Sequence, residues 1–318
     1  MIQLLLFALL VLLELLYFKV AGQLNIIDKP NERSSHQQAT MLGGGVIFIF
    51  AIVLYYFVFG MHYSWFVLGA LVLAIVSYVD DLKPLPPRLR LPVQFGSVLL
   101  MFLEIDIYSL PLWMVVLVLV ISVGILNATN FMDGINGMLG MTSMVVLGSL
   151  LYINQWVVSF VDTQLLILLL LSVLIFNFFN YRKKAVCFAG DVGSFTIGIA
   201  MLFLISRLIW VTGNVYWIAM LAVYGVDTLL TIAHRIMLGE NIALPHRKHV
   251  FQLLANELKI SHLLTSAIYA LLQLVVIIGL IVFAENAYLF AGLAIFILTI
   301  AYLIIKQKYY YLHQQKTA

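Results

Sequence analysis

The sequence predicts an all-α protein that crosses a membrane many times. Hydrophobic residues make up 64% of the 318 residues and charged residues only 10%, whereas a soluble globular domain is about one quarter charged. Apolar runs of roughly 17–22 residues recur along the chain, and each can cross a hydrocarbon core of about 30 Å as a helix. Because these runs are continuous and do not alternate, they favour helices over a β-barrel.

Eleven predicted spans make up a single membrane domain that covers residues 1–318. They lie near residues 2–20, 42–60, 64–79, 91–105, 110–126, 137–153, 163–180, 194–211, 214–233, 263–284 and 287–305. The number falls to ten if 91–105, which contains Pro92 and Glu104, only dips into the membrane. No positive side chain precedes the first run, so it is predicted to be a span and not a cleaved signal peptide.

The basic residues predict the orientation of these spans. Of the 17 Lys and Arg residues, 16 fall in the connections 21–41, 80–90, 127–136, 181–193 and 234–262, in the tail 306–318 or at Lys19; Arg207 is the exception. Cytoplasmic loops are enriched in Lys and Arg. We therefore expect the N-terminus outside, the C-terminus inside, and a site in the inner loops. The net charge of +3 gives no indication of a nucleic-acid partner.

Asp80 and Asp81 end the third predicted span. Adjacent carboxylates repel each other, and partial desolvation at a membrane boundary raises that cost. A divalent cation or cationic substrate groups would relieve it. Acids are also common at solvated helix ends, so this motif alone leaves both interpretations open. The nearby Lys83, Arg88 and Arg90 are candidates for phosphate contacts, although the orientation rule explains them equally well.

A second polar motif follows the fifth predicted span. Asn127, Asn130 and Asp133 are spaced by three, so a helical continuation is expected to place them on one face. Asn offers paired donors and acceptors to a ligand, and Asp can hold a metal ion or a ribose hydroxyl. The dipeptides Asp133-Gly134 and Asn136-Gly137 favour turns, but a simple turn does not explain two Asn residues upstream. This motif therefore favours a binding function.

The segment Gly190-Asp191-Val192-Gly193-Ser194 directly precedes a long apolar run. Glycines permit close backbone approach, and Ser194 is expected to cap the helix, whose N-terminal amides attract anions. Asp191 in this position suits Mg²⁺, which takes one or two carboxylates and completes its shell with phosphate and water. A capping loop with an acid at the helix N-terminus is the alternative.

The longest connection, residues 235–261, contains His246, Arg247, Lys248 and His249. These cationic donors can meet phosphate, and an ordinary positive loop is the alternative. A His-x-x-His pair beside a lone Cys187 does not favour a zinc site. Asp227 lies inside the ninth predicted span, and acids within membrane spans usually have a function. A structural partner such as Arg235 is the other explanation for it.

Taken in order, these motifs resemble the polyprenyl-phosphate N-acetylhexosamine-1-phosphate transferases. The resemblance spans about residues 20–255 and adds Phe188 before Gly190, Arg33-Ser34-Ser35-His36 and Gly43-Gly44-Gly45 in the first inner loop. It implies transfer of a sugar 1-phosphate from a UDP-activated N-acetylhexosamine to undecaprenyl phosphate, with release of UMP, on the cytoplasmic face of a bacterial inner membrane.

The same resemblance implies a role for individual residues. The implied catalytic residues are Asp80, Asp81, Asp191 and His249; the implied substrate-binding residues are Asn127, Asn130, Asp133, Asn136, Phe188 and Arg247. Phe188 would stack on uracil. Asp191, together with Asp80, would hold Mg²⁺, with Mn²⁺ as the alternative ion. Membrane lipid is an expected partner, and a homodimer is left open.

Two departures from the family pattern narrow the expectation. Ala39-Thr40-Met41-Leu42 replaces the Pro-Thr-Pro-Arg of many members, and His249-Val250-Phe251-Gln252 replaces His-x-His-His. The second change favours the branch that begins O-antigen or capsule units over the one that uses UDP-N-acetylmuramoyl-pentapeptide. A secondary transporter is the rival class, but transporter sites lie near the midplane between repeats, and no repeat is evident. An inactive assembly subunit is a third alternative.

Overall fold

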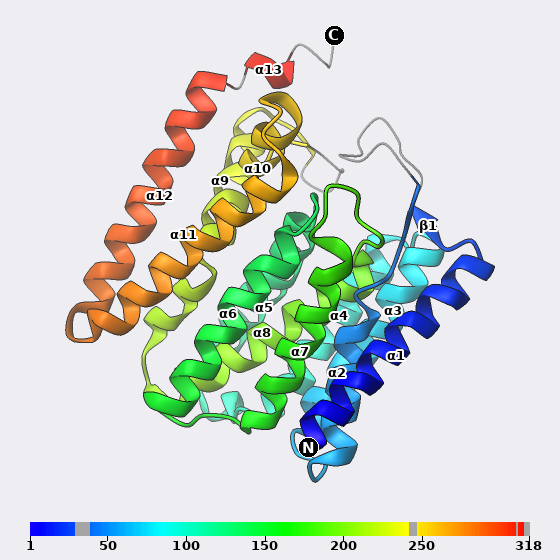
Figure 1. Cartoon of the computed structure of the whole chain (residues 1–318). Helices are drawn as coiled ribbons and strands as arrows, with labels where there is room; N and C mark the ends of the chain where they lie inside the picture. The colour runs from blue at the N-terminus through cyan, green and yellow to red at the C-terminus, as the bar shows by residue number, and fades with distance from the viewer. Residues whose placement is uncertain (29–38, 242–246, 310, 315–318) are drawn as a thin grey trace.

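The computed structural model describes residues 1–28, 39–241, 247–309 and 311–314, and it is built almost entirely of helices (Figure 1). The long helices are α1 (Ile2–Gln23), α2 (Val46–Val58), α3 (Ser64–Leu82), α4 (Pro87–Leu103), α5 (Leu112–Met132), α6 (Met138–Trp156), α7 (Thr163–Asn180), α8 (Gly190–Thr212), α9 (Ala222–Met237), α11 (His262–Val282) and α12 (Ala287–Tyr309).

Shorter elements connect these helices. They are β1 (Ile27–Asp28), β2 (Thr40–Met41), α10 (Val250–Gln252), α13 (Tyr311–Gln314), the 3₁₀ segments Ile107–Ser109, Val215–Leu221 and Ala284–Asn286, and the π-helical turn Leu253–Glu257. β1 and β2 pair antiparallel, with Ile27 opposite Met41. Met41 also forms a bridge with Cys187, which ties this pair to the segment before α8.

Each of the eleven predicted spans coincides with one of the long helices. Within the described residues, nine helical segments are long and apolar enough to cross a membrane, counting Val215–Met237 as one. α2 has only 13 residues, and α4 contains Arg88, Arg90 and an internal Pro92. The chain is therefore a multi-pass helical membrane protein, while the count of eleven crossings and their orientation stay predictions.

Three helices extend further than predicted into the polar motifs. α3 continues to Leu82 instead of 79, α5 continues to Met132 instead of 126, and α8 begins at Gly190 instead of 194. The polar side chains in these extra turns find partners on other helices, as described below. Such contacts between distant segments stabilise helical turns that the local hydropathy does not predict.

α8 is the central helix of the bundle. It packs against α2, α3, α5 and α6, and most of its side chains are buried. On one side Phe203 stacks on Phe66 of α3, with ring centroids 4.1 Å apart. On another, Gly193 meets Gly45, where a Cβ on Gly45 would lie 2.3 Å from the Gly193 Cα. This buried helix positions Asp191 at its first turn.

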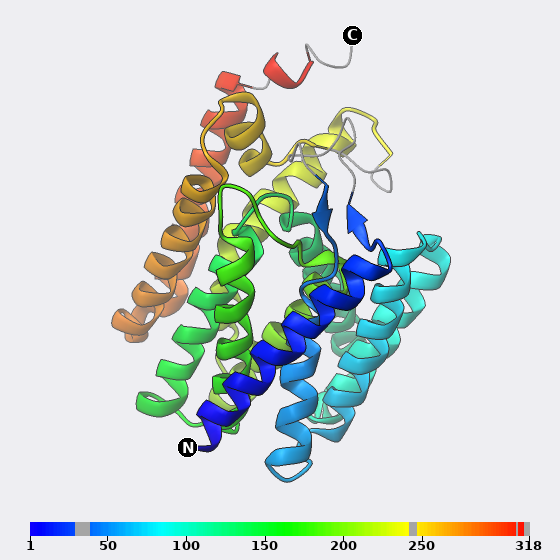
Figure 2. The same cartoon turned by 45° about the vertical axis from the view of Figure 1, so that its right-hand side comes forward.

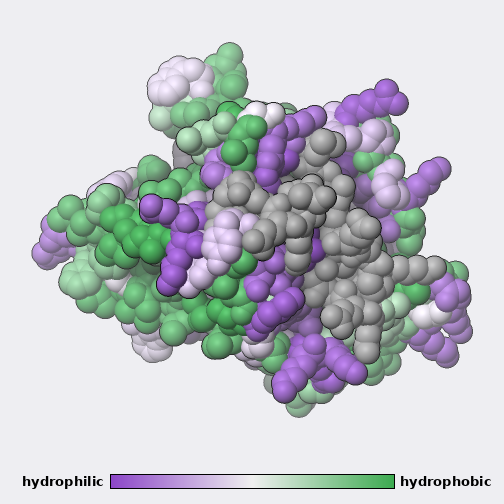
Figure 3. All heavy atoms as spheres, turned by 90° about the horizontal axis from the view of Figure 1, so that it is seen from above, coloured by the Kyte–Doolittle hydropathy of each residue, from purple (hydrophilic) through white to green (hydrophobic). Residues whose placement is uncertain are grey.

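The two ends of the bundle differ. The N-terminus lies at one end, and β1, α10 and α13 lie at the other, which we call the polar end (Figures 1 and 2). Seen from above, hydrophilic side chains lie beside the centre and along the right and lower edges of the polar end, whereas hydrophobic side chains predominate on the left (Figure 3). α12 lies at the edge of the bundle, with exposed apolar side chains such as Leu289 and Phe296, as expected for a lipid-facing helix.

Candidate functional site

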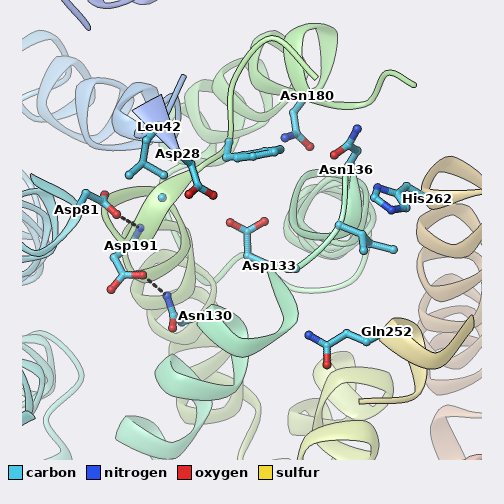
Figure 4. A pocket seen from close by; sticks show the side chains of 14 residues that line it. Asp28, Leu42, Asp81, Asn130, Asp133, Asn136, Asn180, Asp191, Gln252 and His262 are labelled. Atoms are coloured by element: carbon cyan, nitrogen blue, oxygen red, sulfur yellow. Dashed lines mark hydrogen bonds between the residues drawn. The ribbon is translucent and has the colours of Figure 1, made fainter. Parts of the chain in front are cut away.

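A pocket of about 300 Å³ opens at the polar end (Figure 4). It is lined by Asp28, Leu42, Asp81, Asn130, Asp133, Gly134, Ile135, Asn136, Asn180, Phe188, Gly190, Asp191, Gln252 and His262. These residues come from all five predicted inner connections or the helix ends that flank them. Segments that are far apart in the sequence therefore meet around one cavity.

Asp81 caps the start of α8. Its Oδ1 accepts the Asp191 N–H at 2.8 Å and its Oδ2 accepts the Val192 N–H at 3.0 Å. The first N–H groups of a helix lack intrahelical acceptors, and a negative charge there is favourable. Gly190 makes this approach possible: its φ is +72°, and a Cβ on it would lie 2.6 Å from Asp81 Oδ2.

The carboxylate of Asp191 is held from two other helices. Asn130 Nδ2 on α5 donates to Asp191 Oδ1 at 2.8 Å and also to Ser194 Oγ at 2.8 Å. Arg90 Nη2 on α4 lies 3.4 Å from Asp191 Oδ2. Because three helices converge on this one side chain, its position over the pocket is fixed by the core of the bundle.

The carboxylate of Asp80 has other partners than that of Asp81. Its Oδ1 accepts the Leu85 N–H at 2.5 Å, and its Oδ2 lies 3.0 Å from Arg90 Nε. Arg90 thus joins Asp80 to Asp191, and Asp80 does not line the pocket. The sequence predicts that Asp80 and Asp81 act as one functional pair, whereas their carboxylates have different partners in the structure.

Asp133 follows the last residue of α5, and its carboxylate points into the pocket (Figure 4). No hydrogen bond among the described residues reaches that carboxylate, although the Asn130 amide lies on the neighbouring turn. Burial, and secondarily the negative charge of Asp191, raises the pKa of Asp133 to about 7. The acidic groups of the pocket therefore outnumber the basic groups beside them, and a bound cation would stabilise their ionised forms.

The amide side chains around the pocket hold its loops together. Asn180 Oδ1 accepts the Gly137 N–H at 2.7 Å, and its Nδ2 donates to the Cys187 carbonyl at 2.8 Å. Asn136 Nδ2 donates to the Arg182 carbonyl at 2.8 Å. The loop after α5 and the loop after α7 are therefore joined by direct hydrogen bonds at the rim of the pocket.

Asn127 lies apart from the pocket. Its Nδ2 donates to Gln94 Oε1 on α4 at 2.7 Å and to the Val123 carbonyl at 2.8 Å. The expectation that Asn127, Asn130 and Asp133 share one face is therefore met only by the last two. In this structure Asn127 joins α5 to α4, and its predicted contact with substrate stays a prediction.

Phe188 lines the pocket, as a base-stacking residue would need to. Its backbone is fixed at both ends, because its N–H donates to the Met41 carbonyl and its carbonyl accepts the Gly44 N–H, each at 2.8 Å. These two backbone hydrogen bonds hold Phe188 between β2 and the glycines that precede α2.

His249 directly precedes α10 and is 2% exposed. Its Nδ1 lies 3.3 Å from Asp227 Oδ1 on α9. Asp227 also accepts the Val250 N–H at 3.1 Å and the Tyr269 hydroxyl at 2.7 Å. Asp227 thus anchors this loop. Arg235, the partner suggested by the sequence, pairs instead with Glu240.

The other predicted residues of that loop are placed differently. Gln252, three residues after His249, lines the pocket, whereas His249 and Arg247 do not. His246 and the segment Arg33-Ser34-Ser35-His36 lie outside the described residues. Gln252 Oε1 also accepts the His249 N–H at 3.3 Å, so the two side chains are linked.

Four pocket residues were not singled out from the sequence: Asp28, Asn180, Gln252 and His262. Asp28 ends β1, and its place in the predicted inner connection 21–41 is its one sequence signal. Asn180 ends an apolar helix, where a buried amide is itself a signal. His262 begins α11 directly after the Ser261 cap, whose hydroxyl accepts the Leu264 N–H at 3.2 Å.

The donor set of the pocket suits a hard divalent cation. Asp81, Asp133 and Asp191 all line it, and carboxylate oxygens are what Mg²⁺ prefers. In the part of the chain that the structure describes, no group of three or more His, Cys, Asp or Glu residues is arranged to hold an ion alone. Any ion here would therefore complete its shell with water or substrate phosphate, which is usual for Mg²⁺.

Comparison with known proteins matches the same part of the chain. The family model described as glycosyl transferase family 4 matches residues 63–209, which run from the start of α3 to the end of α8. That region contains Asp81, Asn130, Asp133 and Asp191, the residues that meet around the pocket.

Individual relatives extend the match over most of the chain. A Bacillus subtilis protein named probable undecaprenyl-phosphate N-acetylglucosaminyl 1-phosphate transferase is 24% identical over 309 residues, which cover 91% of this chain and 86% of that protein. The undecaprenyl-phosphate α-N-acetylglucosaminyl 1-phosphate transferases of Escherichia coli K12 and Yersinia pestis are 27% and 26% identical over 264 residues, covering 74% of this chain and 71% of each relative. The chain is therefore similar to glycosyl transferase family 4 over residues 63–209, and to named members of the undecaprenyl-phosphate N-acetylglucosaminyl 1-phosphate transferases over most of its length.

Proposed function

We propose that this protein transfers an N-acetylhexosamine 1-phosphate from a UDP-sugar to undecaprenyl phosphate and releases UMP. The observation that carries the proposal is the acidic pocket at the polar end, where Asp81, Asp133 and Asp191 meet beside an apolar bundle. The names of the matching relatives support the same reaction. A soluble nucleotide and a membrane lipid can both reach such a position.

In the proposed reaction, an oxygen of the lipid phosphate attacks the β-phosphorus of the UDP-sugar. The new bond joins the two phosphates of a lipid diphosphate sugar, and the broken bond frees UMP with the bridging oxygen. Reactions of this kind depend mainly on positioning and on stabilising charge. We propose direct displacement, without a covalent intermediate on the protein.

Mg²⁺ fits this pocket, with Asp191 as the first ligand and Asp133 as the second. When bound, the ion would neutralise charge on the diphosphate and on the departing UMP. Asp80, the second ligand suggested by the resemblance, is already occupied by Arg90 and the Leu85 N–H. We therefore assign Asp80 to holding Arg90 beside Asp191, and Asp81 to fixing the first turn of α8.

The other pocket residues are suited to hold the donor. Phe188 offers a flat face to uracil, and Gln252 and His262 offer polar groups across the pocket from Asp81 and Asp191 (Figure 4). His249 is connected to the pocket through Gln252, whose side chain accepts the His249 N–H. We propose that these residues bind and orient the nucleotide sugar.

The proposed setting is a bacterial inner membrane with the pocket on the cytoplasmic face. We further propose that the reaction begins O-antigen, capsule or another surface-polysaccharide unit. The replacement of the His-rich family motif by His249-Val250-Phe251-Gln252 supports this branch over the one that uses UDP-N-acetylmuramoyl-pentapeptide.

The test uses the purified full-length protein in detergent with undecaprenyl phosphate, Mg²⁺ and radiolabelled UDP-N-acetylglucosamine, UDP-N-acetylgalactosamine or a deoxy-N-acetylhexosamine donor. We expect organic-extractable label, equimolar UMP, and loss of both on addition of EDTA. An Asp191→Ala variant is the matched negative control. Absence of turnover with every donor, with EDTA making no difference, would contradict the proposal.

A further inference from the structure

The C-terminal helix α12 meets the rest of the bundle differently at its two ends. Its buried side chains are two alanines in its first turns and two polar residues near the polar end: Ala287, Ala291, Tyr302 and Lys306. α12 contacts α9 and α10 there (Figure 1). Polar groups within a span are costly unless they have partners, so a helix that faced only lipid would not bury a hydroxyl and an ammonium group. The polar end of α12 is therefore held by specific polar contacts.

Lys306 turns its side chain inward. It is 5% exposed, whereas Lys308 on the next part of the same turn is exposed, as is usual for a lysine that extends from the end of a span to water. The Lys306 Nζ donates a hydrogen bond to the Lys248 carbonyl. Lys248 lies in the segment 247–252, which we call the donor loop because Gln252 at its end lines the acidic pocket. Lys306 thus joins α12 to the backbone of the donor loop.

Tyr302, one turn before Lys306, reaches the same loop through α9. Its hydroxyl lies 3.0 Å from Thr231 Oγ1, and Thr231 Oγ1 donates to Asp227 Oδ1 at 3.2 Å. Because the Thr231 hydroxyl has a single proton, Tyr302 is the donor in the first of these bonds. Asp227 in turn accepts the Val250 N–H at 3.1 Å. α12 therefore contacts the donor loop directly through Lys306 and indirectly through Tyr302.

The donor loop lies against the segment that carries Asp133. The Phe251 ring is beside Gly134, where a Cβ would be 2.8 Å from Phe251 Cζ, and Gly134 directly follows Asp133. Gln252, the residue after Phe251, lines the pocket itself. Leu298 of α12 packs against the small core that contains Phe251. A shift of the donor loop would therefore displace Gln252 and disturb the surroundings of Asp133.

From these contacts we infer that Lys306 is a positioning residue for the transfer reaction: by holding the Lys248 carbonyl, it keeps Gln252 in place to bind the nucleotide sugar. Lys306 does not line the pocket, so it acts through the donor loop and not on the substrate. The inference rests on the proposed function for the role of the donor loop. It assigns a part in donor binding to α12, a helix outside the pocket.

The first test measures the order of the donor loop without substrate. Hydrogen exchange is followed by mass spectrometry in the full-length protein in detergent, for the wild type and for Lys306→Met, which keeps the length of the side chain and removes its charge. Because hydrogen bonds to charged groups are among the stronger ones, we expect the amides of residues 250–256 to exchange about tenfold faster in Lys306→Met. Peptides from the start of α8 should exchange at the wild-type rate.

Lys308→Met is the matched control, because it makes the same change at an exposed position of the same helix. It should exchange like the wild type, and Lys306→Arg, which keeps a charged donor, should recover most of the protection. Wild-type exchange of the donor loop in Lys306→Met would overturn the inference. Equal acceleration at the start of α8 would overturn it too, because it would show general destabilisation. Since this measurement needs neither donor nor turnover, its result is independent of whether the proposed reaction is found.

The second test uses the steady-state kinetics of the active protein. We expect Lys306→Met to raise the KM for the UDP-sugar by about tenfold, equivalent to about 1.4 kcal/mol, while kcat and the KM for undecaprenyl phosphate stay within about twofold. Lys306→Arg should recover most of the donor affinity, and Lys308→Met should change neither KM. If Lys306 served only the stability of α12, Lys306→Met would lower the melting temperature and the amount of active protein and leave the donor KM unchanged. That result would contradict the assignment.

Discussion

Asp81 uses both of its carboxylate oxygens to accept backbone N–H groups at the start of α8. A general base must also reach the proton that it removes. In the proposed reaction the acceptor is a phosphate monoester, whose second pKa is about 6. It is therefore mostly dianionic at neutral pH and has little need of a base to remove its last proton. Asp81 is therefore better suited to hold Asp191 in place than to transfer protons.

This assignment predicts the behaviour of Asp81→Asn. The amide loses one acceptor and the negative charge at the helix end, so Asp191 shifts, and we expect kcat to fall by about a hundredfold, as small misplacements do. Raising the pH to about 8.5 should not restore activity, since no missing base is being replaced. The measurement is kcat against pH for both proteins. Full recovery at high pH would show that Asp81 acts as a base.

Gly190 offers a sharper test of the same contact. Gly190→Ala would force a left-handed φ on Ala, costing roughly 1–2 kcal/mol, and would also push against Asp81 Oδ2. Gly213, at the other end of α8, has a similar φ of +68° but open space around it. We expect both variants to lose comparable thermal stability from strain, and only Gly190→Ala to lose most of its activity. Equal activity in the two variants would contradict the role of the Asp81 contact.

The spacing of Asn127, Asn130 and Asp133 shows how far single residues can be placed from sequence. Three residues turn a helix about 60° short of a full circle. Asn130 is therefore near both neighbours, but Asn127 and Asp133 are about 120° apart. The sequence predicts a polar cluster correctly, and helix geometry then sends Asn127 to Gln94 and Asn130 to Asp191. The packing of α4 and α8 against α5 determines which side of α5 faces the pocket.

At the scale of elements, one buried acid anchors the start of α10. Asp227 on α9 accepts hydrogen bonds from the backbone of Val250 and Phe251 and from the side chains of Tyr269 and Thr231. The sequence indicates that Asp227 matters, but its partners come from positions up to 42 residues away. Local pattern carries no information about such contacts.

Loss of this anchor should open the loop to protease. A hydrogen bond to a charged group contributes about 1.5–3 kcal/mol, so we expect Asp227→Asn to speed tryptic cleavage after Arg247 and Lys248 by about tenfold. Tyr269→Phe removes one of the bonds and should give a smaller increase. Tyr288→Phe, at an exposed ring, is the control. Cleavage at the wild-type rate in Asp227→Asn would show that the loop is held by other contacts.

Glu240 ties the end of α9 to the same loop and predicts a dependence on pH. It pairs with Lys248 and with Arg235, whose Nε lies 3.1 Å from Glu240 Oε2. The Lys248 hydrogen bond, more than any other contact, lowers the pKa of Glu240 below its usual 4.5. A lowered acid pKa stabilises the fold above the unfolded pKa, and the gain is lost as pH falls through the folded pKa.

We therefore expect Glu240→Gln to melt at a lower temperature than the wild type at neutral pH, with the difference shrinking below about pH 4.5. The measurement is the melting temperature in detergent across this range. Glu285→Gln, at an exposed turn on the opposite end of the bundle, should show no such trend. A difference that persists unchanged at low pH would indicate a role independent of charge.

At the scale of the whole molecule, hydropathy predicts the fold better than the site. Eleven apolar segments become eleven helices because each must satisfy its backbone hydrogen bonds within itself in lipid. Hydropathy does not determine which helices pack against each other. It follows from contacts such as Phe66 with Phe203 and Gly45 with Gly193, which join segments more than a hundred residues apart. The pocket, and the divergence of Asp80 from Asp81, are consequences of that packing.

Cys187 makes the predicted orientation testable by labelling. It is the only cysteine in the chain, it is buried, and burial, with the nearby charges of Glu14 and Asp133, raises its thiol pKa. Since the thiolate is the reactive form, the wild type should react little with a maleimide. A cysteine introduced at an exposed position can therefore be observed against a low background.

The two ends of the bundle each offer such a position. Glu285 lies in the exposed turn between α11 and α12, at the end opposite the polar end (Figure 1). Lys184 is exposed in the loop between α7 and α8, at the polar end. Since basic loops stay in the cytoplasm, we expect a membrane-impermeant maleimide to label Glu285→Cys in intact cells and to label Lys184→Cys only after lysis. The wild type controls for Cys187. The reverse pattern would place the acidic pocket outside the cell, where no UDP-sugar is made, and would contradict the orientation together with the donor proposed for this site.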